Sequence, residues 1–142
     1  LLTERGRALI ERRIAGRELT VGILAERALP VLEVIPADGA YDYEAKYNRD
    51  DTQYIASPDL PAGAAESLKA AAEAAHKILG CRDFSRVDFI LGADGTAHVL
   101  EVNTIPGFTD HSLLPKAAAA AGIGFERLCD RICRLAMRRR RR

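Results

Sequence analysis

The stretch SRVDFILGADGTAHVLEVNTIPG, residues 85–107, decides the fold of this chain. Two apolar runs flank an Asp-Gly pair at 94–95, and this pattern predicts a β-hairpin with a two-residue type I′ turn. In that register Asp88 lies opposite Glu101, and Arg86 lies opposite Asn103. Because strand side chains alternate between the two faces of a sheet, these four polar side chains share one face. The other face is predicted to point to a core, through Val87, Phe89, Leu91, Leu100 and Val102.

The polar face of this hairpin has an unusual charge pattern. Two carboxylates directly opposite each other repel unless positive charge lies between them. Two carboxylates and an amide are hard oxygen ligands, which suit Mg²⁺ or Mn²⁺ and not zinc, and magnesium usually takes its remaining ligands from substrate phosphates. The hairpin therefore predicts a platform for metal and phosphate. The alternative is a solvent-facing polar ribbon in which Arg86 pairs with either acid, and a longer loop would shift the register.

The segment NTIPGFTDHS, residues 103–112, follows the hairpin directly. Gly107 after Pro106 allows the backbone to approach a ligand closely. Ser112 is a good N-cap for a helix, and the free N–H groups at a helix N-terminus favour an anion such as a carboxylate. Metal, phosphate and carboxylate together indicate activation of a carboxylate by phosphoryl transfer.

The remaining pattern predicts three earlier strands, at 8–14, 17–25 and 29–36, followed by a long loop at 37–53. Helices are predicted at 62–79, 112–121 and 125–137, the first stopped by Gly80. The order of these elements predicts an α+β domain, with a mainly antiparallel sheet and helices packed on one side. The apolar stripes expected on the first and last helices are Leu68, Ala71, Ala75, Ile78 and Leu79, and Phe125, Leu128, Cys129, Ile132 and Cys133.

Composition places the 142 residues in one soluble domain, with 48% hydrophobic and 29% charged residues. There is no run long enough to span a membrane and no signal peptide pattern. The net charge is +1, and without the five arginines at 138–142 the rest carries −4. That arginine run predicts either a nucleic-acid contact or a disordered tail, and the rest of the sequence shows no basic stripe with aromatic residues.

Cys129 and Cys133 could share a metal ion, but small buried thiols in a reducing cytoplasm fit better. His76 and His98 are interpreted as surface residues.

Several segments together carry a family resemblance: ELTVGIL, LPVLEVIP, YDYEAKY, TQYIASPDLP, LGCRDFSRVDFIL, VLEVNTIPGFTDHSLLPKAA and GIGFERLCDRI. They closely resemble the C-terminal part of bacterial D-alanine–D-alanine ligases, members of the ATP-grasp superfamily, from about residue 9 to 136. The resemblance implies an ATP-grasp C-terminal lobe over 1–137, with 138–142 as a basic tail. It implies an enzyme of peptidoglycan precursor synthesis that joins two D-alanines through a D-alanyl phosphate, giving ADP and phosphate.

The resemblance also implies roles for individual residues. Asp88 and Asn103 would each hold one of two magnesium ions, with Mn²⁺ as a substitute, and Glu101 would bridge the two ions. Arg86 would stabilise the transferring phosphoryl group, and the N–H of Gly107 would complete an oxyanion hole. The carboxylate of the second D-alanine would bind Ser112 and the N–H of Leu113.

Two further segments match the nucleotide site of the family. Lys46 and Tyr47 resemble the mobile loop over the phosphates, where Lys46 would meet the γ-phosphate and Tyr47 would shape the second amino-acid pocket. The segment IERRIAGRE, residues 10–18, resembles the adenine hinge, in which Glu11, Arg12 and Ile14 would line the base and Glu18 would bind the ribose. The alternative readings are a solvated loop and an exposed strand edge with charged guards.

The family also has N-terminal and central lobes that this sequence does not contain. The resemblance therefore implies that the 142 residues alone do not ligate, and that the missing N-terminal part, ATP and D-alanine are the partners. It also implies a cytoplasmic homodimer for the intact enzyme, without nucleic-acid or membrane partners. Two alternatives remain open, namely another ATP-grasp carboxylate–amine ligase and a non-catalytic nucleotide-binding module.

Overall fold

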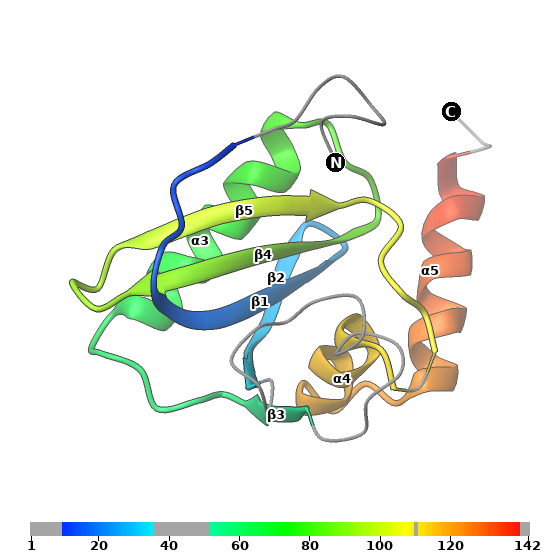
Figure 1. Cartoon of the computed structure of the whole chain (residues 1–142). Helices are drawn as coiled ribbons and strands as arrows, with labels where there is room; N and C mark the ends of the chain where they lie inside the picture. Colours follow the sequence, from blue (N-terminus) through cyan, green and yellow to red (C-terminus); the bar gives the residue numbers. More distant parts are fainter. Residues whose placement is uncertain (1–9, 36–51, 110, 140–142) are drawn as a thin grey trace, which may run out of the picture.

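The structure, a computed structural model, describes residues 10–35, 52–109 and 111–139 (Figure 1). The predicted α+β class is confirmed, and the three predicted helices are present with nearly the expected bounds. The elements are β1 (Gly16–Leu24), β2 (Arg27–Ile35), β3 (Gln53–Ala56), α3 (Ala64–Ile78), β4 (Phe84–Gly92), β5 (Ala97–Asn103), α4 (Leu113–Ala120) and α5 (Phe125–Arg139). None of the described helices is long and apolar enough to cross a membrane.

The strands form one antiparallel sheet in the order β3-β2-β1-β4-β5. β1 lies at its centre, between β2 and β4, and β5 lies at an edge (Figure 1). Two sequence predictions fail here. Residues 10–14 of the strand expected at 8–14 are irregular, and residues 8 and 9 lie outside the described part. β3 begins inside the segment predicted to be a loop, because a four-residue strand is too short to show a clear alternation of side chains.

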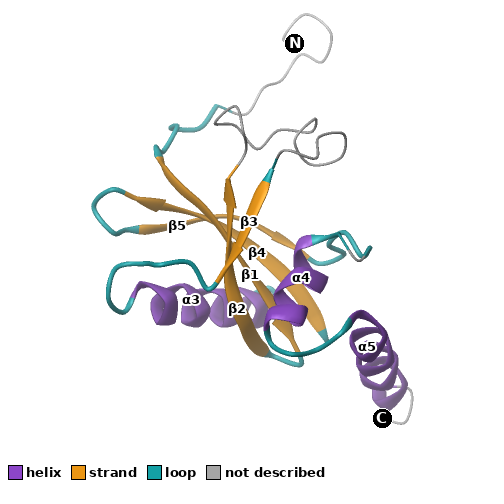
Figure 2. Cartoon of the chain, turned by 90° about the horizontal axis from the view of Figure 1, so that it is seen from below, coloured by secondary structure: helices purple, strands orange, loops and turns teal. Residues whose placement is uncertain are grey.

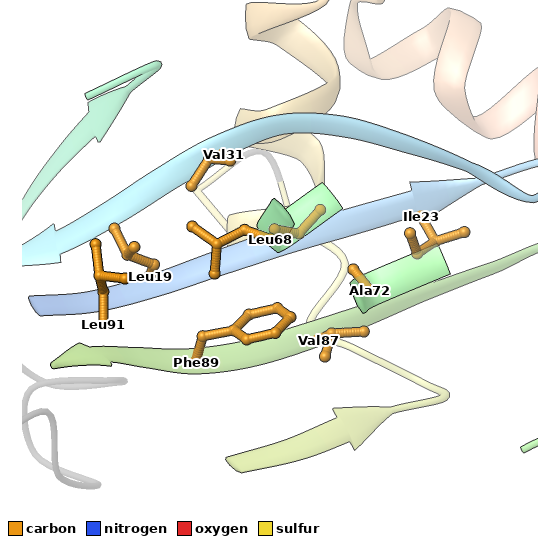
Figure 3. Close-up of a cluster of buried hydrophobic side chains, with 9 residues drawn as sticks. Leu19, Ile23, Val31, Leu68, Ala72, Val87, Phe89 and Leu91 are labelled. Carbon is orange, nitrogen blue, oxygen red and sulfur yellow. The ribbon is translucent and has the colours of Figure 1, made fainter. Parts of the chain in front are cut away.

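Helix α3 covers one face of the sheet. Leu68 and Ala72 are fully buried, and they pack in one cluster with Val21 of β1 and Phe89 of β4 (Figure 3). His76, one helical turn further, is also only 2% exposed, which corrects its interpretation as a surface residue. The buried stripe of α3 is therefore Leu68, Ala72 and His76, and the predicted stripe members Ile78 and Leu79 are 81% and 64% exposed.

Backbone and side-chain polar contacts fix the end of α3. The backbone N–H groups of Gly80 and Cys81 donate to the carbonyls of Lys77 and His76, and Gly80 has a φ of 64°, so a Schellman motif ends the helix there. The Nδ1 atom of His76 lies 2.7 Å from Ser85 Oγ. Its Nε2 atom is buried without a hydrogen-bond partner among the described residues, and burial lowers the pKa of this imidazole.

Helix α4 packs on the opposite face of the sheet. A Cβ atom added to Gly22 would lie 2.7 Å from Leu114 Cδ1 of α4, whereas the neighbouring Val21 packs with the α3 cluster. Consecutive strand residues point to opposite faces, so α3 and α4 lie on either side of the strands (Figure 2). This corrects the prediction that the helices pack on one side, because a helical stripe does not reveal which sheet face it covers. Leu128 of α5 is buried in the α4 cluster.

The β4–β5 hairpin differs from its prediction at the turn. Its loop has three residues, Ala93 to Gly95, closed by Gly92 N–H donating to Thr96 O, with Gly95 at a φ of 79°. A bulge between Asp88 and Phe89 then places Leu100 as an extra residue on β5. The extra loop residue and the bulge offset each other, so the predicted pairs beyond the bulge are correct. Leu100 itself is 57% exposed and does not point to the core.

The C-terminal helix is longer than predicted. α5 includes Arg138 and Arg139, the first two residues of the arginine run, and residues 140–142 lie outside the described part. All three cysteines are free. Cys81 and Cys129 are half-buried, but Cys133 is exposed, so the reading of small buried thiols is wrong for Cys133.

Candidate functional site

Three neighbouring strands place a row of polar side chains on the sheet face opposite α3. Thr20 of β1 pairs with Asp88 of β4, and Asp88 in turn pairs with Glu101 of β5. Arg86 pairs with Asn103 in the same hairpin. The two cross-strand pairs predicted from the sequence are therefore confirmed, and the sheet adds Thr20 to them.

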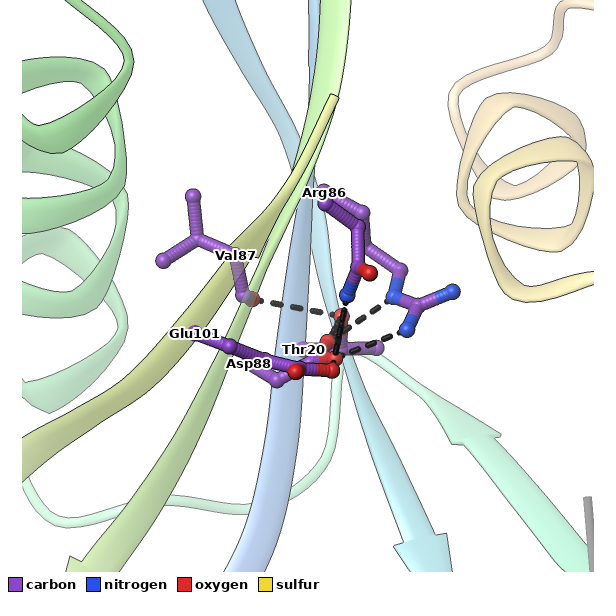
Figure 4. A network of polar contacts seen from close by, with 6 residues as sticks. Thr20, Arg86, Val87, Asp88 and Glu101 are labelled. Carbon is purple, nitrogen blue, oxygen red and sulfur yellow. Dashed lines mark hydrogen bonds and ion pairs between the residues drawn. The ribbon is translucent and has the colours of Figure 1, made fainter. Parts of the chain in front are cut away.

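The Asp88 carboxylate lies at the centre of this row (Figure 4). Its Oδ1 atom accepts hydrogen bonds from Thr20 Oγ1 at 2.6 Å and from Arg86 Nε at 2.8 Å. Its Oδ2 atom accepts from Arg86 Nη2 at 2.7 Å and from Asn103 Nδ2 at 3.1 Å. Asn103 Nδ2 also donates to Glu101 Oε1 at 2.9 Å. The Asn103 amide thus joins the two carboxylates.

The ion pair between Arg86 and Asp88 is largely shielded from water. Their side chains are 7% and 17% exposed, and both guanidinium bonds go to the same carboxylate. Bidentate pairs of this kind are among the strongest charge-assisted hydrogen bonds. The alternative prediction that Arg86 pairs with one of the two acids is therefore correct. Its second part, that the pair lies on a ribbon facing solvent, is wrong because both side chains are largely buried.

The oxygen atoms of this row fit a hard divalent cation. Two carboxylates lie within hydrogen-bond distance of one amide group, whose oxygen can replace its nitrogen by rotation of the Asn103 side chain. Among the described residues no group of three or more His, Cys, Asp and Glu side chains could hold a metal ion. The donor set here is smaller, so a cation needs further ligands, such as water or substrate phosphates.

A cleft of about 830 Å³ opens beside this row. Its volume is in the range of small-molecule binding sites. It brings together the residues predicted as an adenine hinge and two of the predicted metal ligands. The predicted residues that line it are Glu11, Arg12, Ile14, Glu18, Asp88, Glu101 and Leu113.

The segment before α4 forms a second group next to this cleft. The space that a side chain at Gly107 would occupy is taken by Ser112 Oγ, 3.0 Å from the position of the added Cβ atom. Ser112 is the N-cap residue of α4, as predicted, but its side chain makes no capping bond. Its Oγ accepts instead from Thr109 N at 3.0 Å and lies 2.9 Å from Thr109 Oγ1. Leu113, next in the chain, lines the cleft.

Sequence reasoning missed three residues of the cleft region. Thr20 lies on the same sheet face as Glu18, because side chains alternate along a strand. This shared face would have identified Thr20 as a site residue if the pairing of β1 with β4 had been known. His98, interpreted as a surface residue, is half-buried in the cleft wall, and Leu100 reaches the cleft because of the bulge. The predicted loop residues Lys46 and Tyr47 lie outside the described residues.

Comparison with known proteins identifies the family of this chain. The family model described as D-ala D-ala ligase C-terminus matches residues 2–134. The chain belongs to this family. A relative from Anaeromyxobacter dehalogenans, a D-alanine–D-alanine ligase, is 46% identical over 127 residues, which are 89% of this chain and 41% of the relative. The chain therefore spans about two fifths of the length of such relatives.

Solved ligase structures have the same fold. The D-alanine–D-alanine ligase from Bacillus anthracis complexed with ATP superposes with a TM-score of 0.77 at 36% identity, covering 92% of this chain and 41% of that one. The VanG D-Ala:D-Ser ligase from Enterococcus faecalis gives 0.72 at 32% identity, covering 87% and 37%. The ATP-grasp fold of this ligase family is thus confirmed for the described sheet and helices.

Proposed function

We propose that this chain is the C-terminal catalytic portion of an ATP-dependent D-alanine–D-alanine ligase of peptidoglycan precursor synthesis. One observation carries the proposal. A single cleft joins the hinge segment around Glu11 to the paired carboxylates of Asp88 and Glu101. A nucleotide in this cleft would have its base at the hinge and its phosphates beside the carboxylates. The family membership and the ATP complex of the similar Bacillus anthracis enzyme support ATP as this nucleotide.

Within this proposal Asp88, Glu101 and Asn103 hold Mg²⁺, for which Mn²⁺ is a substitute. The cation, when bound, neutralises the negative charge of the phosphates. Arg86 supplies a fixed guanidinium at the same place, and fixed positive charge near developing negative charge is the largest common contribution to catalysis. The full-length polypeptide supplies the remaining parts of the site, and the 142 residues alone are inactive.

The end of the cleft at α4 is the proposed site of the amino-acid substrate. The N–H of Gly107 stabilises the developing oxyanion, and the hydroxyl of Ser112 with the N–H of Leu113 binds the carboxylate of the second D-alanine. Lys46 meets the γ-phosphate and Tyr47 shapes the second amino-acid pocket in this proposal, and both lie outside the described residues. Glu18 binds the ribose hydroxyls, beside Arg12 and Ile14 at the base. These assignments make the N-terminus of α4 an anion site.

The first test uses the chain as it stands. ATP affinity is measured by calorimetry with and without Mg²⁺ in the parent, in Glu101→Gln and in Glu126→Gln. Glu126 is an exposed residue in the first turn of α5, so its substitution is a matched control for the loss of one charge. We expect Mg²⁺ to strengthen ATP binding in the parent and the control, and to have no effect in Glu101→Gln. ATP binding that is indifferent to Mg²⁺ in the parent would favour a non-catalytic nucleotide-binding module.

The second test uses the longer polypeptide and measures ADP release. We expect release to require both D-alanine and Mg²⁺, and to be lost in Glu101→Gln but not in Glu126→Gln. Release driven by D-alanine together with D-serine or D-lactate would retain the ligase reaction but change the second substrate. The similarity to a D-Ala:D-Ser ligase makes D-serine the necessary comparison. Release driven only by an unrelated amino acid would identify another ATP-grasp carboxylate–amine ligase.

A further inference from the structure

Thr20 is a buried polar residue in the centre of the sheet, where its hydroxyl meets the polar row. The residue is 2% exposed and lies directly across from Asp88 on the neighbouring strand. Its Oγ1 atom lies 2.6 Å from Asp88 Oδ1 and 3.3 Å from the Val87 carbonyl oxygen. A hydroxyl has one hydrogen to donate, and the shorter contact to an ionised acceptor is the stronger of the two. Thr20 therefore donates to Asp88.

The donors around Asp88 differ in how firmly they are held. Thr20 and Arg86 are both more than nine-tenths buried. Thr20 reaches Oδ1, whereas Arg86 reaches both carboxylate oxygens, Oδ1 through Nε and Oδ2 through Nη2. Asn103, at the end of the edge strand β5, is half-buried and reaches Oδ2. The same Asn103 nitrogen also reaches Glu101, so Oδ2 is the Asp88 oxygen on the side of the second carboxylate.

We propose that Thr20 is a positioning residue for the metal site, whose hydroxyl acts with the Arg86 guanidinium to fix the Asp88 carboxylate so that Oδ2 faces Glu101. This inference rests on the proposed function, because it assumes that the two carboxylates hold a cation. The role of Thr20 would be exerted through Asp88, to which its hydroxyl donates. Partners that orient a ligand in this way typically change metal affinity by about 10–100-fold when they are removed.

A packing role is the competing explanation, since the γ-methyl group of Thr20 lies in a closely packed sheet. Two pairs of variants separate the hydroxyl from the methyl group. Thr20 and Thr20→Val have nearly the same shape but differ in the hydroxyl. Thr20→Ser and Thr20→Ala both lack the methyl group and again differ in the hydroxyl. If Thr20 acts only by packing, the parent and Thr20→Val should have the same Mn²⁺ affinity. If its hydroxyl positions Asp88, Thr20→Ser should have the Mn²⁺ affinity of the parent.

The experiment measures Mn²⁺ affinity of the chain by water-proton relaxation, with the thermal unfolding midpoint of each protein recorded in parallel. We expect Mn²⁺ to bind about tenfold or more weakly to Thr20→Val than to the parent, and to Thr20→Ala than to Thr20→Ser. Thr96→Val is the matched control, because it removes a hydroxyl that bonds an aspartate, Asp94, in the exposed turn. If either member of one pair does not fold, the other pair still gives the comparison.

The outcomes separate this inference from the proposed function. Equal Mn²⁺ affinity within both pairs would overturn the role of Thr20 while leaving the metal site intact. Mn²⁺ binding that is absent from the parent, or unchanged in Glu101→Gln, would overturn the metal site and the inference with it. Weaker binding that follows the hydroxyl, with Thr96→Val equal to the parent, would support the positioning role.

Discussion

Replacing Arg86 by methionine would remove the guanidinium and keep a long apolar side chain in the sheet. Asp88 would lose its hydrogen bonds from Arg86, at 2.8 and 2.7 Å, in a site where its side chain is only 17% exposed. Removing one partner of a buried ion pair costs about 3–5 kcal/mol. Because Asp88 keeps some contact with water and its bonds from Thr20 and Asn103, we expect the lower end, about 3 kcal/mol. For a chain of this length that is a fall of about 10 °C in Tm.

The assay is urea and thermal unfolding of Arg86→Met and of the double variant Arg86→Met/Asp88→Asn. The double variant no longer has a carboxylate at position 88 that has lost its guanidinium partner, so it should recover about 2 kcal/mol of the loss. Mn²⁺ should raise the Tm of Arg86→Met more than that of the parent, since the cation replaces the missing positive charge between Asp88 and Glu101. A loss below about 1 kcal/mol, or a double variant no more stable than the single one, would refute this reasoning.

Two further predictions concern other parts of the fold. Burial lowers the pKa of His76, so the unfolded chain binds a proton more readily than the folded chain. The free energy of unfolding therefore keeps its full value above the unfolded pKa of about 6.5, and it falls as the pH drops below that value. Urea unfolding between pH 7.5 and 5.5 should show this fall in the parent and a flatter profile in His76→Gln, and equal profiles would contradict it. Gly22→Ala places a Cβ atom 2.7 Å from Leu114 Cδ1 and 3.0 Å from Leu29 Cδ1, and overpacking of this kind costs about 1–3 kcal/mol. An unchanged thermal midpoint would contradict the close packing of α4 on β1.

The cross-strand pairs of the site could be predicted because side-chain alternation depends only on register. The predicted turn was too short by one residue, and the bulge at Leu100 was not predicted, yet Asp88 still lies opposite Glu101. The bulge has no clear sequence signal here, since the adjacent apolar residues Val99 and Leu100 do not by themselves show which residue is the extra one. The pairing of β1 with β4 could not be predicted from the sequence either, because packing of the whole sheet determines which strands pair when they are far apart in the chain. Thr20 was missed for that reason.

The burial of His76 shows the limit of residue type as a guide to exposure. Histidine is intermediate in its tendency to be buried, and Ile78 and Leu79 offered a more apolar continuation of the α3 stripe. The helix ends at Ile78, however, and its last turn rotates these two side chains away from the sheet. His76 is accepted in the core because Ser85 of β4 provides a hydrogen-bond partner for Nδ1.

The arrangement of charge distinguishes the polar row from an ordinary solvated sheet face. α4 covers only part of the face opposite α3, so the remainder would be polar in any soluble protein. A solvated face gains most when opposite charges lie across from each other, because like charges at that distance repel. Here Asp88 and Glu101 lie across from each other, and Arg86 belongs to the same strand as Asp88. These three ionised side chains carry a net negative charge. A cation bound between the two strands would lower the repulsion between the two carboxylates, and this is the physical reason to expect a metal ion at this position.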